Sequence, residues 1–266
     1  MILDDIVAAK RQEIEAAKLR LPPDELMRRV RGRRAERGFA EALRCSPRRP
    51  ALIAELKRKS PSRGMLRERF DPVSLAQQLQ DAGASALSIL TDERFFGGHL
   101  EFLRDVHQFT EVPCLRKDFL IDPYQIYEAA YYQADAVLLI VRLLKPEQLS
   151  QLLALAGELG MDALVEVHAE TELTIALEAG AQLIGINQRD LSTFTMRPEL
   201  TGRLVPTIPP GRTIVAESGL HTADDLRRAR ELGVHAVLIG ESIMMAPDVT
   251  AKIRDLFAGV WPPASP

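Results

Sequence analysis

Charged and amide side chains stand at the ends of several short apolar segments. Lysine can supply a proton or a positive charge, and glutamate can accept or donate a proton, so together they suit acid–base work on an anionic substrate. A structural ion-pair network could explain one or two of them, but burying so many charges is costly and poorly repaid in stability. We therefore expect a catalytic site. Its residues are Glu55, Lys57, Lys117, Glu166, Asn187 and Glu217, with Ser218 next to the last.

Three loops have the composition of an anion site. Ser218-Gly219 and Gly240–Ser242 are short loops after apolar segments, where backbone N–H groups could surround a phosphate. Residues 57–64 form a basic, serine-bearing loop that could close over the same group. Each loop alone is a common turn, but together they predict a phosphate site. Nucleotide binding has no support, because neither GxGxxG nor GxxxxGK[ST] occurs.

The elements that must position these residues alternate regularly after Pro50. Short Val/Ile/Leu/Ala runs with weak alternation are typical of strands buried on both faces, as in a parallel sheet covered by helices. Their spacing of roughly 26 residues suits one βα unit, so eight units predict an α/β fold, the (β/α)8 TIM barrel, over residues 48–266. A doubly wound open sheet is the alternative. The runs are 51–57, 86–90, 112–117, 136–141, 163–167, 183–187, 213–217 and 236–240.

Residues 1–47 predict a helical N-terminal extension instead. Ile2, Leu3, Ile6 and Val7 recur at helical spacing, and the sequence Leu21-Pro-Pro-Asp interrupts the pattern before a second helix. Such an apolar face must cover something, so we expect the extension to pack on the barrel near its active face. Six arginines lie between positions 28 and 37. They predict a solvated helix face, with a partner-binding or phosphate-steering patch as the alternative.

Composition narrows the class of protein. The chain has 266 residues, 46% hydrophobic and 27% charged, with a formal charge of −3, which favours a globular protein without general attraction to nucleic acid or membranes. Cys45 and Cys114 are far apart, and neither a disulfide nor a zinc or other metal site is expected. The acidic N-terminus does not resemble a signal peptide, and no apolar run reaches membrane-spanning length. We expect a cytoplasmic protein.

Six ordered motifs resemble the indole-3-glycerol phosphate synthase family of tryptophan biosynthesis, across essentially the whole chain. The resemblance implies a ring closure without cofactor. In it, 1-(2-carboxyphenylamino)-1-deoxyribulose 5-phosphate loses CO2 and water and becomes indole-3-glycerol phosphate. The substrate is a small phosphorylated molecule, and association with other enzymes of the pathway cannot be deduced from the sequence. The motifs are Ile53–Ser62, Leu90–Gly98, Leu115–Tyr124, Ile184–Leu191, Val215–Gly219 and Leu238–Ser242.

The resemblance also implies residue roles. Lys117 matches the general acid that protonates the substrate carbonyl, and Glu166 a general base or acid that completes the indole. Lys57 matches the lysine that meets the substrate carboxylate, and Glu55 and Asn187 hold hydroxyl groups and the lysines. The division of work between the two lysines stays open.

Two positions depart from the family pattern. Gln188 and Met245 stand where the family has asparagine and arginine; Gln188 preserves hydrogen bonding, whereas Met245 removes a cation.

Three alternative functions remain beside this resemblance. They are a phosphosugar isomerase, a Schiff-base aldolase using Lys117 or Lys57, and a nucleic-acid-binding or scaffold protein. The implied substrate contacts are Phe96, Leu138, Leu191, Arg189, Glu217 and Ser218, and the implied phosphate contacts are Ser60, Gly219, Gly240, Glu241 and Ser242.

Overall fold

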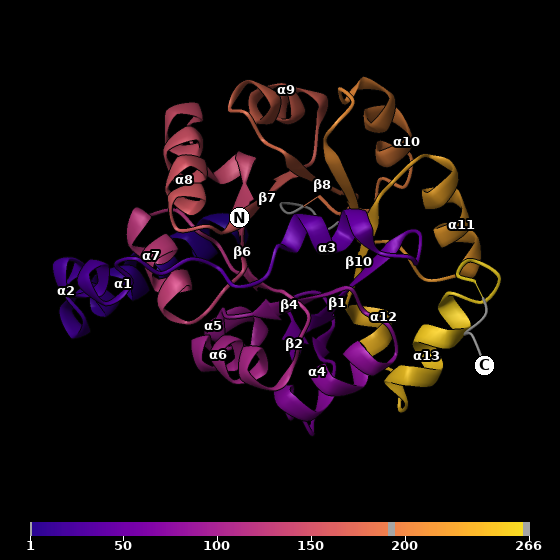
Figure 1. Cartoon of the computed structure of the whole chain (residues 1–266), viewed down its shortest axis with the longest axis horizontal. Helices are drawn as coiled ribbons and strands as arrows, with labels where there is room; N and C mark the ends of the chain where they lie inside the picture. Colours follow the sequence, from indigo (N-terminus) through magenta and orange to yellow (C-terminus); the bar gives the residue numbers. More distant parts are fainter. Residues whose placement is uncertain (1, 191–194, 263–266) are drawn as a thin grey trace.

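Eight parallel strands close into a barrel in the computed structural model, which describes residues 2–190 and 195–262 (Figure 1). Every apolar run predicted as a strand is one, so the barrel is confirmed and the open sheet is wrong. The order around the barrel is β1-β10-β9-β8-β7-β6-β5-β4. The strands are β1 Ala51–Leu56, β4 Ala86–Leu90, β5 Cys114–Lys117, β6 Ala136–Ile140, β7 Asp162–Val167, β8 Leu183–Asn187, β9 Thr213–Glu217 and β10 Ala236–Ile239.

The period of two along each strand determines which side chains reach the barrel interior. On β1, Leu52, Ala54 and Leu56 pack against the outer helices, whereas Ile53 belongs to the inner cluster. Glu55 is therefore on the inner side, one pleat nearer the C-terminal end. On β5, Lys117 lies two positions after Leu115 of the inner cluster, so its side chain also points to the inner side. This alternation directs charged side chains from several strands into one end of the barrel.

Helices surround the barrel and connect its strands (Figure 1). Four of them end at a glycine with positive φ, as the sequence predicted: Gly83, Gly160, Gly180 and Gly233. A short hairpin, β2 Lys59–Ser60 with β3 Gly64–Met65, follows β1 and was not predicted. The helices are α4 Pro72–Asp81, α5 Glu93–Phe96, α6 Leu100–Phe109, α7 Pro123–Tyr131, α8 Pro146–Glu158, α9 Glu170–Glu178, α10 Leu200–Leu204, α11 Ala223–Glu231, α12 Glu241–Met244 and α13 Val249–Leu256, with 3-10 turns η1 Val141–Leu143 and η2 Val205–Thr207.

The N-terminal segment contains α1 Ile2–Arg20, α2 Pro23–Arg29 and α3 Phe39–Cys45. Helix α1 lies at the C-terminal end of the barrel, where Leu3 and Ile6 join the inner apolar cluster. Lys10 of α1 lies 3.0 Å from Asp92 Oδ2 and 2.9 Å from Asp118 Oδ1, just beyond β4 and β5. This contact lies at the C-terminal end of the barrel. Figure 1 shows α1 and α2 beside α7.

Helix α3 lies at the opposite, N-terminal end of the barrel, which the sequence did not predict. Phe39 and Leu43 are fully buried among the inner residues, and the N–H of Ala40 donates to Asp162 at the start of β7. Arg37 donates to the carbonyl oxygens of His107 and Val112. Residues 2–47 therefore place helices at both ends of the barrel, and Arg37 holds the segment before α3 against the barrel.

The described part of the chain also shows the state of the two cysteines and the length of its apolar helices. Cys45 and Cys114 are free thiols. No described helix is both long enough and apolar enough to cross a bilayer.

Candidate active site

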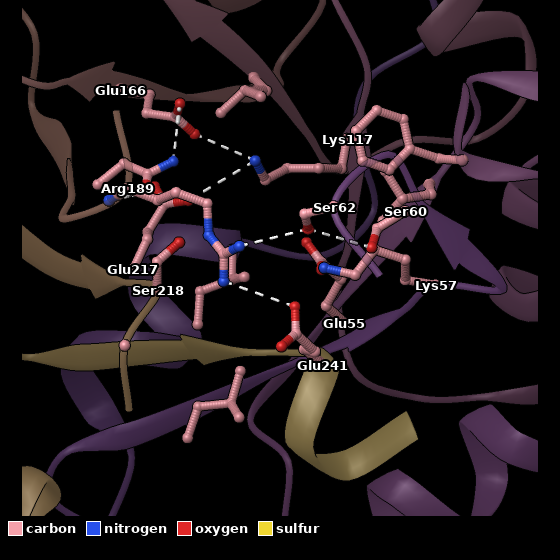
Figure 2. Close-up of a pocket in the computed structure, with 18 of the residues that line it drawn as sticks. Glu55, Lys57, Ser60, Ser62, Lys117, Glu166, Arg189, Glu217, Ser218 and Glu241 are labelled. Atoms are coloured by element: carbon pink, nitrogen blue, oxygen red, sulfur yellow. Dashed lines mark hydrogen bonds and ion pairs between the residues drawn. The ribbon is translucent and has the colours of Figure 1, made fainter. Parts of the chain in front are cut away.

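One cavity opens at the C-terminal ends of the strands, and the predicted site residues converge on it (Figure 2). The structure brings together every predicted site residue that it describes; Leu191 lies outside the described residues. Charged groups from β1, β5, β7 and β9 face each other there, together with the amide of Asn187 on β8. The predicted residues lining the cavity are Glu55, Lys57, Ser60, Phe96, Lys117, Leu138, Glu166, Asn187, Arg189, Glu217, Ser218, Gly219, Gly240, Glu241 and Ser242.

Lys117 lies at the centre of the charged groups. Its Nζ is 3.1 Å from Oε2 of Glu166 and 3.7 Å from Oε2 of Glu217 (Figure 2). Burial opposes the positive charge, but the carboxylates of Glu166, Glu217 and Glu55 outweigh it and raise the pKa of Lys117 above its usual range. The side chain is therefore an ammonium at neutral pH and can act as a proton donor.

The two buried glutamates beside Lys117 differ in charge. Burial opposes ionisation of Glu166, but Lys117 and His168 overcome it and hold the pKa of this carboxyl well below its usual range. Asn187 Nδ2 also donates to Oε1 of Glu166 over 3.2 Å. Glu217 has no hydrogen-bond partner for either oxygen within the described structure, and burial together with the negative charge of Glu166 raises its pKa to about 8. One ionised and one protonated carboxyl therefore flank the lysine.

A second lysine–glutamate pair comes from β1 and its following loop. Lys57 Nζ lies 2.6 Å from Oε1 of Glu55. A Cβ added at Gly240 would overlap Oε1 of Glu55, and one at Gly185 would overlap Oε1 of Glu217. Gly240, predicted as a phosphate contact, therefore also makes room for a glutamate of the site.

Aromatic and aliphatic side chains form one wall of the cavity. The rings of Phe96 and Phe119 are 6.0 Å apart between centroids and tilted by 38°. Leu138 and Ile140 of β6 line the same cavity. Sequence reasoning assigned no role to Phe119, although it follows Lys117 by two positions and so shares its inward direction. The wall can hold a planar aromatic ring against the charged groups.

Serine, arginine and glycine groups lie at the other side of the cavity. Arg189 approaches Ser62 Oγ at 3.4 Å and Glu241 Oε2 at 3.5 Å (Figure 2). Arg63 Nε lies 3.2 Å from Glu241 Oε1. The N–H of Arg63 donates to Ser60 Oγ. Sequence reasoning missed Ser62 and Arg63 as individual contacts, although it placed both in the basic loop. The side chain of Glu241 engages the arginines, so only its backbone N–H suits a phosphate.

The two departures from the family pattern have different surroundings. Gln188 is buried, and its Nε2 donates to the carbonyl of Ser218 over 2.9 Å, which supports the turn before Gly219. Met245 has 56% of its surface exposed and does not line the cavity. Gln188 therefore makes a hydrogen bond to a residue that lines the site.

Comparisons with known proteins agree with this arrangement. The family model for indole-3-glycerol phosphate synthase matches residues 3–256. The indole-3-glycerol phosphate synthase of Roseiflexus castenholzii is 48% identical over 264 residues, covering 96% of this chain and 97% of that protein. The enzyme of the same name from Dehalococcoides mccartyi strain CBDB1 is 46% identical over 259 residues, covering 96% of this chain and 100% of that protein.

A solved structure of another enzyme shows the same fold. The thiamine phosphate pyrophosphorylase of Pyrococcus furiosus superposes with a TM-score of 0.60, covering 79% of this chain and 95% of that one at 16% identity. That likeness concerns the barrel alone, whereas the matched family model and the relatives above extend over nearly the whole chain. The chain therefore belongs to the indole-3-glycerol phosphate synthase family.

Proposed function

We propose that the cavity carries out the indole-3-glycerol phosphate synthase reaction with Lys117 as the proton donor. The observation that carries this assignment is the position of Lys117 between two buried glutamates, opposite an aromatic wall. As the aromatic ring carbon attacks the substrate ketone, the carbonyl oxygen becomes an alkoxide and needs a proton at once. A buried ammonium supplies that proton without a metal or cofactor.

Lys57 and Glu166 complete the chemistry in this proposal. Lys57, oriented by Glu55, meets the carboxylate of the substrate until CO2 leaves. Glu166 is ionised, so it can accept the proton that is lost when water is eliminated. Asn187 orients Glu166 through its amide. Loss of CO2 and then of water gives the indole ring.

The groups opposite the wall bind the phosphate in this proposal. Ser60, Ser242 and the backbone at Gly219 face the cavity together with Arg189. A phosphate held there positions the reacting end, because binding energy from a remote group can be used to orient the reaction. Phe96 and Phe119 hold the anthranilate ring.

The Schiff-base alternative is less well supported by the geometry. A nucleophilic lysine needs a lowered pKa, yet three carboxylates raise that of Lys117. Borohydride reduction in the presence of a ketose phosphate should leave Lys117 unmodified. A phosphosugar isomerase would bind a similar phosphate without releasing CO2.

The direct test is incubation of the protein with the carboxyphenylamino substrate. We expect indole fluorescence to appear with release of one equivalent of CO2. Isomerised substrate without CO2 would support the isomerase instead, and a borohydride-trapped lysine adduct would support the aldolase. Cytoplasmic location stays a prediction from the sequence.

A further inference from the structure

His168 lies immediately after β7, with only 1% of its side chain exposed. Its Nε2 is 3.1 Å from Oε1 of Glu166, off the line of a good hydrogen bond, and its Nδ1 is 3.2 Å from Oε2 of Glu172 on α9. The backbone N–H of His168 donates to that same Oε2 over 2.7 Å. One buried ring thus stands between two carboxylates.

The contacts determine the protonation of this ring. A neutral imidazole keeps a lone pair on one nitrogen, and that lone pair would face a carboxylate oxygen. The imidazolium instead places a positive charge beside both carboxylates and donates from Nδ1 to Oε2 of Glu172. Burial opposes the charge, but Glu166 and Glu172 outweigh it and raise the pKa of His168 to about 9.

Further charged groups extend from both sides of the ring. On the side of the ring that faces Glu172, Oε1 of Glu172 accepts from Arg142 Nε of η1 over 2.9 Å, and Arg142 NH1 lies 3.4 Å from Asp190 after β8. On the side that faces the cavity, Glu166 also contacts Lys117 of β5 and Asn187 of β8. Glu217 of β9 faces Lys117 from the remaining side.

Glu166 and Glu217 therefore compete for a single ammonium. Two carboxylates that share one cation in a buried site cannot both ionise cheaply, so one of them takes up a proton. Lys117 already favours Glu166, since its Nζ donates to Oε2 of Glu166 over 3.1 Å and lies 3.7 Å from Oε2 of Glu217. A second cation on the same side strengthens that preference. His168 touches Glu166, and Glu217 has no second cation beside it within the described structure.

We propose that His168 is a positioning residue of the active site, whose imidazolium reinforces Glu166 rather than Glu217 as the ionised carboxylate and keeps it beside Lys117. The inference rests on the proposed role of Glu166 as a base. It adds a residue behind the catalytic groups that touches no substrate and acts only through Glu166, with Glu172 as its own anchor.

The test is the pH dependence of kcat and KM for His168→Asn, from about pH 4 to about pH 10. Asparagine keeps a buried polar group but no charge, so Glu166 must ionise with only Lys117 and Asn187 to support it. We expect kcat at neutral pH to fall about tenfold because part of the negative charge passes to Glu217, KM to stay within about twofold, and the acid limb of kcat to move up into the measured range.

Glu172→Gln provides a second, milder variant that keeps the ring in place. With one carboxylate gone, the imidazolium loses its proton at lower pH, so activity should decline earlier on the alkaline side. NMR of the His168 ring should show its titration moving down by about one unit. An unchanged pH profile in both variants would overturn the proposal.

Two further variants separate the possible causes of a change. His107→Asn removes another buried histidine, which meets Asp135 at 3.4 Å on the N-terminal side of the barrel, and should lower thermal stability without moving either limb. If His168→Asn behaves the same way, its role is structural and the proposal is wrong.

Glu166→Gln separates this inference from the proposed function. If Glu166→Gln retains turnover, the assignment of Glu166 as the base is wrong. If Glu166→Gln is inactive while the pH profile of His168→Asn is unchanged, only the present inference fails.

Discussion

Glu166 and Glu217 show how surroundings give the same residue type two roles. Lys117, Asn187 and His168 surround Glu166, whereas within the described residues Glu217 meets only the more distant ammonium of Lys117. Glutamine resembles a protonated glutamate in shape and charge. Glu217→Gln should therefore keep kcat at neutral pH within about tenfold, while Glu166→Gln should lose ~10²–10⁴-fold. Steady-state kinetics checks this, and equal losses in the two variants would contradict the assigned charges.

The two predicted phosphate glycines should also respond differently. Gly219 has φ +71°, so alanine there strains the turn that presents backbone N–H groups to the phosphate. Gly219→Ala should raise KM by about tenfold with a smaller change in kcat. Gly240→Ala would push Glu55 aside and should lower kcat more than it raises KM. A rise in KM alone for Gly240→Ala would leave this glycine a phosphate contact only.

At the scale of elements, the strands were predictable and several contacts were not. Buried strands have continuous apolar runs, and period two directs Lys117 and Glu166 inward, so both follow from local sequence. The hairpin β2–β3 has two residues per strand, too few to show a pattern. The position of α3 at the N-terminal end and the pairing of Glu241 with Arg63 depend on tertiary packing, which periodicity does not encode.

Helix α1 is expected to depend on Lys10 for its attachment to the active face. Lys10 is 4% exposed and meets Asp92 and Asp118, so Lys10→Met would leave two buried carboxylates without this cation. Loss of one partner of a buried ion pair costs about 3–5 kcal/mol. Lys18→Met on the same helix removes a partly exposed pair with Asp122 and should cost less than about 1 kcal/mol. Denaturant unfolding of the two variants checks this, and equal losses would contradict it.

For the whole molecule, the buried site should make stability fall as pH rises. The folded pKa of His168 rises from 6.5 to about 9 and that of Glu217 from 4.5 to about 8, so each stabilises the fold below its unfolded pKa and loses that contribution as pH rises through the folded one. Below its unfolded pKa, His168 alone contributes roughly 3 kcal/mol to the free energy of unfolding.

The denaturant midpoint of the wild type should therefore decline between about pH 5 and about pH 9, and the midpoint of His168→Asn should decline less over the same range. The pKa of Asp118 is lowered to about 2, because Lys10 and Arg116 outweigh its burial. Its contribution is present above the unfolded value and should be lost as pH falls through about 2. A midpoint that rises steadily from neutral to alkaline pH would contradict these charge assignments.

The central claim is that Lys117 donates the proton that allows ring closure. Lys117→Met keeps the length of the side chain and removes the ammonium, so turnover of the carboxyphenylamino substrate should fall ~10²–10⁴-fold while affinity for indole-3-glycerol phosphate stays within about tenfold. Product fluorescence measures both quantities in one protein preparation. Wild-type kcat in Lys117→Met would contradict the account, since another group would then have to supply the proton.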